Sequence, residues 1–226
     1  MLLAIDTATE MASLALVQDG KLLVETTWHC GQNHTVQLLP QLTVMLEKAG
    51  VNIREIGSIA VAKGPGSFNG LRVGISMAKG LAFSLNVPVI GISTLEIAAY
   101  QYAWSGLPIC AIHNAGRSEI AAATYRMQRK RWEQVQAEHI TTLTVLLSGI
   151  TIKTLFCGEY LPMIAEEVKA KLKAKAVIPA AAALPRRAFF LAELGSQHLA
   201  TGVIDNVATL QPLYLRRPPI TERKHH

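Results

Sequence analysis

The chain passes twice through the same order of elements, in which short strands come first and helices and strands then alternate. In the first half, residues 2–7, 12–18 and 22–27 alternate apolar and polar side chains, and Asp19-Gly20 joins the last two runs as a hairpin turn. The second half also opens with three strand-like runs. This order predicts mixed sheets with helices packed on them.

Two long helical patterns lie in the first half. The first covers about residues 33–49 and ends at Gly50, because glycine readily takes the positive φ of a helix end. The second covers about residues 68–85 and follows the strand-like run 56–62 across a glycine-rich loop. A strand over 88–92 and a short helix after it complete this half.

The second half contains the same kinds of element. The patterns predict, in order, strands over 107–113, 119–126 and 132–140, a helix over 141–148, a strand over 153–157, a helix over 163–173 and a final helix from Pro185 to just before Gly202. We therefore predict an α/β protein of two subdomains, 1–105 and 106–226, each with a five-stranded mixed sheet flanked by helices. The last helix and the extended tail 210–216 are expected to pack back on the first subdomain.

Composition indicates a globular protein of the cytoplasm. Half of the residues are hydrophobic, which is enough for a sizeable core. Asp6 and Glu10 interrupt the start of the chain, and no run of eighteen uncharged apolar residues predicts a membrane span or a signal segment. Cys30, Cys110 and Cys157 are widely spaced, as expected of reduced thiols.

The net charge is +6, and much of it is clustered at 126–131, 169–175, 186–187 and 216–224. Such clusters permit contact with RNA. However, they are more often solvated faces, and no aromatic RNA-binding motif accompanies them. His225 and His226 are set aside, because a terminal histidine pair can be either native or the remnant of a purification tag.

Asp6 and Thr7 lie where the first strand-like run ends. A carboxylate at such a position can meet a metal-bound nucleotide, and the alternative is an aspartate that caps a tight turn. A hairpin that holds phosphate usually needs glycine, and Ala8 takes that place here. The turn is therefore favoured.

A second loop, Gly64–Arg72, connects a strand to a helix and contains Gly66 and Ser67. Free N–H groups and the helix dipole favour an anion at such a point. The alternative is a sharp turn in which Ser67 caps the helix. The loop is not a Walker A motif, because Leu71 and Arg72 follow its last glycine. Both interpretations stay open.

The two long helical patterns each have apolar residues on two sides, and a helix that is apolar on two sides is buried on two sides. One side of each is expected to meet another protein, and the alternative is that the second subdomain or the tail covers it. Sequence alone does not fix which side faces outward. The predicted interface residues are Val36, Leu38, Pro40, Leu42, Val44, Met45, Leu71, Val73, Met77, Gly80 and Ser84.

Catalytic sets are not found. His29 and His34 are five residues apart, about 140° around a helix, and cannot share a face as a metal pair would. Ser67 does not lie in a G-x-S-x-G elbow. The sequence therefore predicts no catalytic residue and no metal site.

Segments spread in order along the chain carry a resemblance to one family. They are 3–9, 34–35 with 39–40, 64–72, 91–95, 114–119 and 212–216. Together they resemble the TsaB (YeaZ) family of bacterial threonylcarbamoyladenosine synthesis, and G-P-G-S-F-N-G-L-R at 64–72 is the most specific of them. The resemblance implies an actin-like ATPase (ASKHA, ribonuclease H-like) fold in both subdomains.

The resemblance also implies a non-catalytic subunit. It pairs through its first two helices with a TsaD-like catalytic protein, acts with a TsaE-like ATPase, and forms homodimers when alone. The tRNA is the substrate of the complex, and no membrane is involved. No cofactor is expected, although ATP or ADP at a vestigial phosphate site (Asp6, Thr7, Gly64, Gly66 and Ser67) is left open. The alternative is an independent small ATPase or kinase that uses Asp6 and the Gly64–Gly70 loop.

Three positions depart from the pattern of the family. Asn69 stands where threonine is usual, Asn114 where aspartate is usual, and Ser118 where glycine is common. We expect any charge-dependent role of position 114 to be weakened in this protein.

Overall fold

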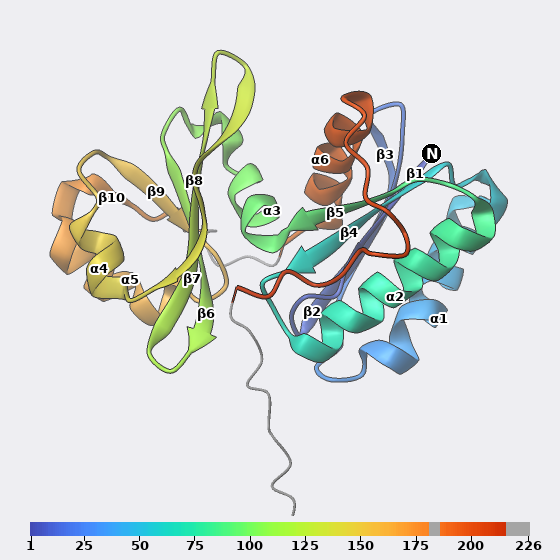
Figure 1. Cartoon of the computed structure of the whole chain (residues 1–226), viewed down its shortest axis with the longest axis horizontal. Coiled ribbons are helices and arrows are strands. Elements are labelled where there is room, and N and C mark those ends of the chain that lie inside the picture. Colours follow the sequence, from blue (N-terminus) through green and yellow to red (C-terminus); the bar gives the residue numbers. More distant parts are fainter. Residues whose placement is uncertain (181–185, 216–226) are drawn as a thin grey trace, which may run out of the picture.

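The computed structural model describes residues 1–180 and 186–215. Two five-stranded sheets lie side by side, each with helices packed on it (Figure 1). The first contains β1 (Leu2–Asp6), β2 (Met11–Gln18), β3 (Lys21–His29), β4 (Ser58–Gly64) and β5 (Val89–Ser93). The second contains β6 (Ile109–Gly116), β7 (Glu119–Gln128), β8 (Arg131–Thr141), β9 (Thr154–Cys157) and β10 (Ala176–Val177). The predicted α/β class is confirmed.

The first sheet has the order β3-β2-β1-β4-β5. Its first three strands are antiparallel, and β1, β4 and β5 are parallel. Because successive side chains of a strand point to opposite faces, β1 contributes Leu3 and Ile5 to one core and Leu2 and Ala4 to another. Helices α1 (His34–Ala49) and α2 (Phe68–Leu85) cover the first face.

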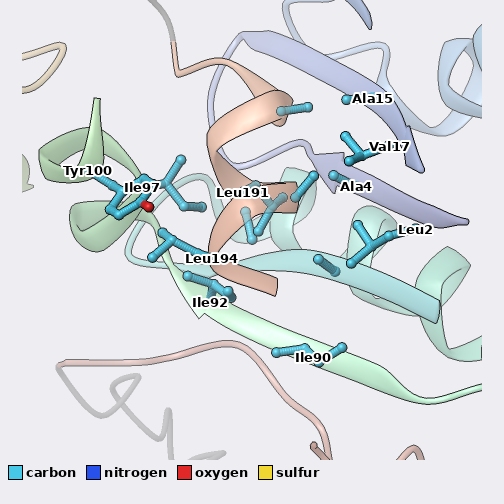
Figure 2. Close-up of a cluster of buried hydrophobic side chains, with 14 of the residues drawn as sticks. Leu2, Ala4, Ala15, Val17, Ile90, Ile92, Ile97, Tyr100, Leu191 and Leu194 are labelled. Atoms are coloured by element: carbon cyan, nitrogen blue, oxygen red, sulfur yellow. The ribbon is translucent and has the colours of Figure 1, made fainter. Parts of the chain in front are cut away.

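The other face of this sheet is covered by α6 (Ala188–Ala200), whose Leu191 and Leu194 belong to one hydrophobic cluster with Leu2 and Val17 (Figure 2). The final helix therefore packs on the first sheet. Pro185, the predicted start of that helix, and Arg216, at the end of the predicted tail, lie outside the described residues. The division of the chain at residues 105 and 106 stays a prediction.

The second sheet has the order β10-β9-β6-β7-β8, the same topology as the first. Helices α4 (Leu143–Ser148) and α5 (Leu161–Leu172) cover one face, and α3 (Thr94–Tyr100) covers the other, between the two sheets. Short 3-10 turns occur at Ile53–Glu55, Ala103–Ser105 and Lys173–Lys175. The two-residue strand β10 was not predicted, because two residues are too few to show a period, and neither were the 3-10 turns.

The tail folds back along the edge of the first sheet. Asp205 bridges to Val89 on β5 and accepts a hydrogen bond from the Gly91 amide at 2.7 Å. Further on, the Leu213 amide donates to the Lys63 carbonyl at 2.7 Å. Figure 1 shows this segment in red, passing from α6 over β5 toward the second sheet. Among the described residues, no helix combines the length and apolar character that a bilayer crossing needs.

Candidate functional site

Helices α1 and α2 begin and end where local chemistry dictates. Gly50 and Asn86 end them in the left-handed conformation, and Ser67 caps the start of α2 by accepting a hydrogen bond from the Gly70 amide at 3.3 Å. The helices contact each other on the same face of the sheet. Each therefore has one side on the sheet and another toward solvent.

The second apolar line predicted for α1 lies on the outward side, whereas that of α2 is exposed only at Gly80 and Ser84. Val36 is 69% exposed and Val44 is 43% exposed. We define the α1–α2 surface as seven of the predicted residues, of which Val73 and Met77 are half-buried against the core and the others exposed. They are Val36, Pro40 and Val44 on α1 and Val73, Met77, Gly80 and Ser84 on α2.

Four of the predicted interface residues lie elsewhere. Leu38, Leu42 and Met45 on α1 and Leu71 on α2 are at most 2% exposed and belong to the cores around the first sheet. Both lines of each helix are apolar, so the sequence could not separate the inward line from the outward one. These four side chains therefore cannot be part of an exposed interface.

Two exposed apolar side chains beside this surface were not predicted. Leu39 on α1 is 59% exposed and Phe83 on α2 is 82% exposed. Neither follows the second apolar lines, which were chosen by regular spacing. A search for large apolar residues off the buried stripe could have found them.

Asp6 is buried in an ion network that joins the two sheets. Its side chain accepts hydrogen bonds from the Ala8 amide at 2.9 Å and from Arg186 Nε at 2.8 Å. Arg186 also donates from Nη1 to Glu159 at 2.9 Å, and Thr9 donates to the same carboxylate oxygen at 3.2 Å. The charge of Asp6 is therefore compensated within the chain.

The glycine loop packs directly on the turn after β1. The Ser67 amide donates to the Ala8 carbonyl at 2.7 Å, and the Thr7 hydroxyl donates to the Gly70 carbonyl at 2.8 Å. A Cβ at Gly66 or Gly70 would overlap a backbone oxygen of this turn. Gly66 and Gly70 are thus needed for the close approach of two loops, a role that the sequence analysis did not include.

These groups do not fit a metal-bound nucleotide. The carboxylate of Asp6 faces a guanidinium cation, which repels a divalent metal, and the Ser67 amide is already bonded within the chain. A Cβ at Gly64 would overlap the side chain of Leu71 and crowd the Leu213 carbonyl. Among the described residues, no group of three or more histidine, cysteine or carboxylate side chains is placed to hold a metal ion.

His34 supports the same turn from α1. Its Nε2 donates to the Thr9 carbonyl at 2.8 Å, and the side chain is buried. The sequence excluded His34 from a metal pair but did not reveal this role, because the acceptor is a backbone oxygen and leaves no side-chain signature.

The end of β6 on the second sheet places polar residues against the glycine loop of the first sheet. His113 lines a pocket together with Gly66 and Tyr214, and burial and the nearby Arg186 lower the pKa of His113 to about 4. Asn114 is exposed and accepts a hydrogen bond from the Gly116 amide at 2.9 Å. Ser118 has a φ of 59°, in the region that glycine favours.

A half-buried acid on α3, Glu96, contacts β8. Trp132 donates from Nε1 to Glu96 at 3.2 Å, and burial raises the pKa of Glu96 to about 7. Trp132 also stacks on Tyr125, with ring centroids 5.5 Å apart. Sequence reasoning missed this cluster, because its members come from three separate elements.

Comparisons with known proteins agree with this architecture. A family model described as TsaD, tRNA N6-adenosine threonylcarbamoyltransferase, matches residues 29–210. The tRNA threonylcarbamoyladenosine biosynthesis protein TsaB of Bacillus subtilis is 32% identical over 219 residues, or 95% of this chain and 93% of that protein. The chain belongs to the TsaB family. The TsaB of Escherichia coli is 38% identical over 137 residues, or 61% of this chain and 55% of that protein.

Solved structures confirm the fold of the TsaB family for this chain. YeaZ from Pseudomonas aeruginosa superposes with a TM-score of 0.81 at 26% identity, covering 95% of this chain and 99% of that one. The ROK hexokinase of Thermus thermophilus has a TM-score of 0.51 at 12% identity, with coverage of 86% and 99%, and shares the fold alone. The predicted actin-like fold is thus confirmed.

Proposed function

We propose that the chain is a non-catalytic subunit in the biosynthesis of threonylcarbamoyladenosine in tRNA. It binds a TsaD-like catalytic protein through the α1–α2 surface and acts in a complex that also contains a TsaE-like ATPase. Without the catalytic protein, the same surface pairs two copies of the chain. Membership of the TsaB family supports the pathway, and the exposed apolar residues support the subunit role.

The observation that carries the proposal is the outward side of the two helices. Val36, Pro40 and Val44 present apolar atoms to solvent on a regular helix, where polar residues would be ordinary. Gly80 adds a second argument, since a Cβ there would meet nothing within 4 Å. The fold of the chain does not need a glycine at this point, whereas a partner helix that approaches closely would.

The proposal includes no nucleotide of its own at Asp6. The rival function, a small ATPase or kinase, needs Asp6 to hold a metal and the glycine loop to hold phosphates. The ion pair of Asp6 with Arg186 and the packing of the loop on Ala8 favour a structural role for both. Turnover of ATP by the isolated chain would favour the rival.

The function is tested by omission. Transfer of the threonylcarbamoyl group to tRNA is measured with a purified TsaD-like protein, a TsaE-like ATPase and the enzyme that makes the threonylcarbamoyl-adenylate, with and without this chain. We expect product only when the chain is present. Equal product without it would refute the subunit role.

The surface is tested with a matched pair of variants. Val36→Asp places a charge in the proposed interface, and Val145→Asp places the same charge on α4. Both are third residues of a helix, and the exposed fractions are 69% and 62%. An acidic residue in the first helical turn suits the helix dipole, so both variants should fold.

We expect Val36→Asp to weaken binding of the TsaD-like protein at least about 100-fold, because a charge in an apolar interface loses its hydration. Val145→Asp should bind as the parent does. Co-elution in size-exclusion chromatography followed by titration measures both. Equal affinities for the two variants would place the interface elsewhere.

A further inference from the structure

The hairpin of β7 and β8 carries a dense positive charge at its tip. We define the basic hairpin as residues 126–133, in which Arg126, Arg129, Lys130 and Arg131 oppose a single acid, Glu133. Arg129, Lys130 and Arg131 are exposed, and Arg126 is half-buried. Within the described part of the chain, the ion pairs include none of these four cations.

The two faces of the basic hairpin differ in kind. Met127 pairs with Trp132, and both side chains pack against the core of the first sheet. Gln128 pairs with Arg131 on the opposite face, which is polar. The hairpin is therefore fixed by its apolar face, and its basic face is free to contact a partner.

The turn at the tip is unfavourable for the residues that form it. Arg129 has a φ of 49° and Lys130 a φ of 65°, so both occupy the left-handed region. Two-residue turns of this type normally use Asn-Gly, which adopts positive φ at low cost. Two long basic side chains at these positions thus lower local stability, and strain of this kind is concentrated at functional sites.

The basic hairpin is remote from the α1–α2 surface. In Figure 1 its tip projects at the top of the molecule, whereas α1 and α2 lie at the lower right. A protein bound to α1 and α2 therefore leaves the hairpin open to a further ligand. The exposed face of the hairpin has cations but no aromatic side chain, a set that suits phosphates better than bases.

We propose that the basic hairpin binds the phosphate backbone of the tRNA that the complex modifies. The inference rests on the proposed function, which brings tRNA to the complex, and adds a direct contact by this chain. Such contacts position RNA without reading its sequence, and they weaken as salt displaces them.

The test variant is Arg129→Asn/Lys130→Gly. It removes two charges and supplies the Asn-Gly pair that the turn prefers, so the hairpin should be at least as stable as in the parent. The matched control is Lys171→Gln/Lys175→Gln, which removes two exposed charges from α5 and the 3-10 turn after it, away from the hairpin. Affinity of the full-length chains for an in vitro transcribed tRNA is measured across a salt series, alongside the Michaelis constant for that tRNA in the reconstituted transfer reaction.

We expect the hairpin variant to raise the dissociation constant and the Michaelis constant for tRNA about tenfold, as the loss of two exposed charge contacts implies. The slope of log affinity against log salt should fall by about one per lost contact. The control should leave all three quantities near parent values. Unchanged values in the hairpin variant, or an equal loss in the control, would overturn the inference.

Two further outcomes distinguish a failure of the proposed tRNA contact from a failure of the proposed subunit function. If product forms equally without the chain, the proposed function fails, and direct tRNA binding still decides the role of the hairpin. If the hairpin variant loses the TsaD-like protein in co-elution and keeps its affinity for tRNA, the hairpin is a protein contact and the RNA inference is refuted.

Discussion

Helices α1 and α2 on the first sheet and α4 and α5 on the second occupy the same positions in one repeated topology. The first pair presents Val36, Val44 and Gly80 outward in regular lines. The second pair presents mixed charge, including an ion pair of Lys169 with Glu166 at 2.9 Å, and its exposed apolar residues are scattered. The sheet dictates which side of a helix is buried, but it leaves the other side to be shaped by function.

The largest expected effect comes from breaking the link between the two sheets. Arg186→Met should lower the free energy of unfolding by about 3–5 kcal/mol, because Asp6 then stays buried without its cation. Urea denaturation measures the loss. In Asp6→Asn/Arg186→Met both charges are gone, so much of the stability should return. A loss below about 1 kcal/mol in the single variant would contradict a structural role for the pair.

The next prediction compares the same substitution on α2 and on α5. Met77 on α2 and Met163 on α5 are methionines on equivalent helices, and Met163 is exposed. Met77→Asp should abolish co-elution with the TsaD-like protein, since a carboxylate would enter an apolar contact. Met163→Asp should leave it intact. Circular dichroism checks that both variants fold, and loss of the complex in both folded variants would remove the distinction between the pairs.

The effect of Glu96→Gln on the free energy of unfolding should depend on pH. The pKa of Glu96 is raised from 4.5 to about 7, mainly by burial; the hydrogen bond from Trp132 and the charge of Lys63 lower it, and the charge of Glu138 raises it. Between these two values the unfolded chain releases the proton before the folded one does, so stability falls as pH rises. Relative to the parent, the variant should gain on the order of 2 kcal/mol at pH 8 and little at pH 4.5. Denaturation at both pH values measures this, and an equal gain at both would exclude titration as the cause.

The smallest effect concerns the turn that corresponds to Asp6 on the second sheet. Asn114→Asp should change the free energy of unfolding by less than about 0.5 kcal/mol, because the new carboxylate is exposed and can keep the bond from Gly116. The added charge should raise the pKa of His113 from about 4. An NMR titration of the imidazole protons measures it. A fall in that pKa would mean that position 114 does not act on His113 by charge.

Much of the fold was predictable because it depends on local signals. The period of 68–85, with Ser67 before it, indicated α2 with the limits that the structure has. The Asp19-Gly20 pair indicated the β2–β3 turn, in which both residues have positive φ. Such features are set by neighbouring residues and require no knowledge of the distant chain.

The candidate site was predictable only in part, because it depends on contacts between distant residues. Arg186 lies 180 positions from Asp6, and in the sequence it looked like one half of an ordinary basic cluster. The outward direction of α1 and α2 was undetermined for another reason, since both apolar lines satisfy the same period. Only the position of the sheet determines that Val36 is exposed and Leu38 is buried.

The returning tail has a consequence for solubility. Strand β5 is the last strand of its sheet, and a bare strand edge can add a strand from another molecule. Asp205 occupies that edge by bonding Val89 and Gly91, while Lys79 holds the segment through the carbonyls of Ala208 and Leu210. We therefore expect a chain cut before Asp205 to associate edge to edge through β5 even with its helices intact, because the segment that covers this strand edge would be gone.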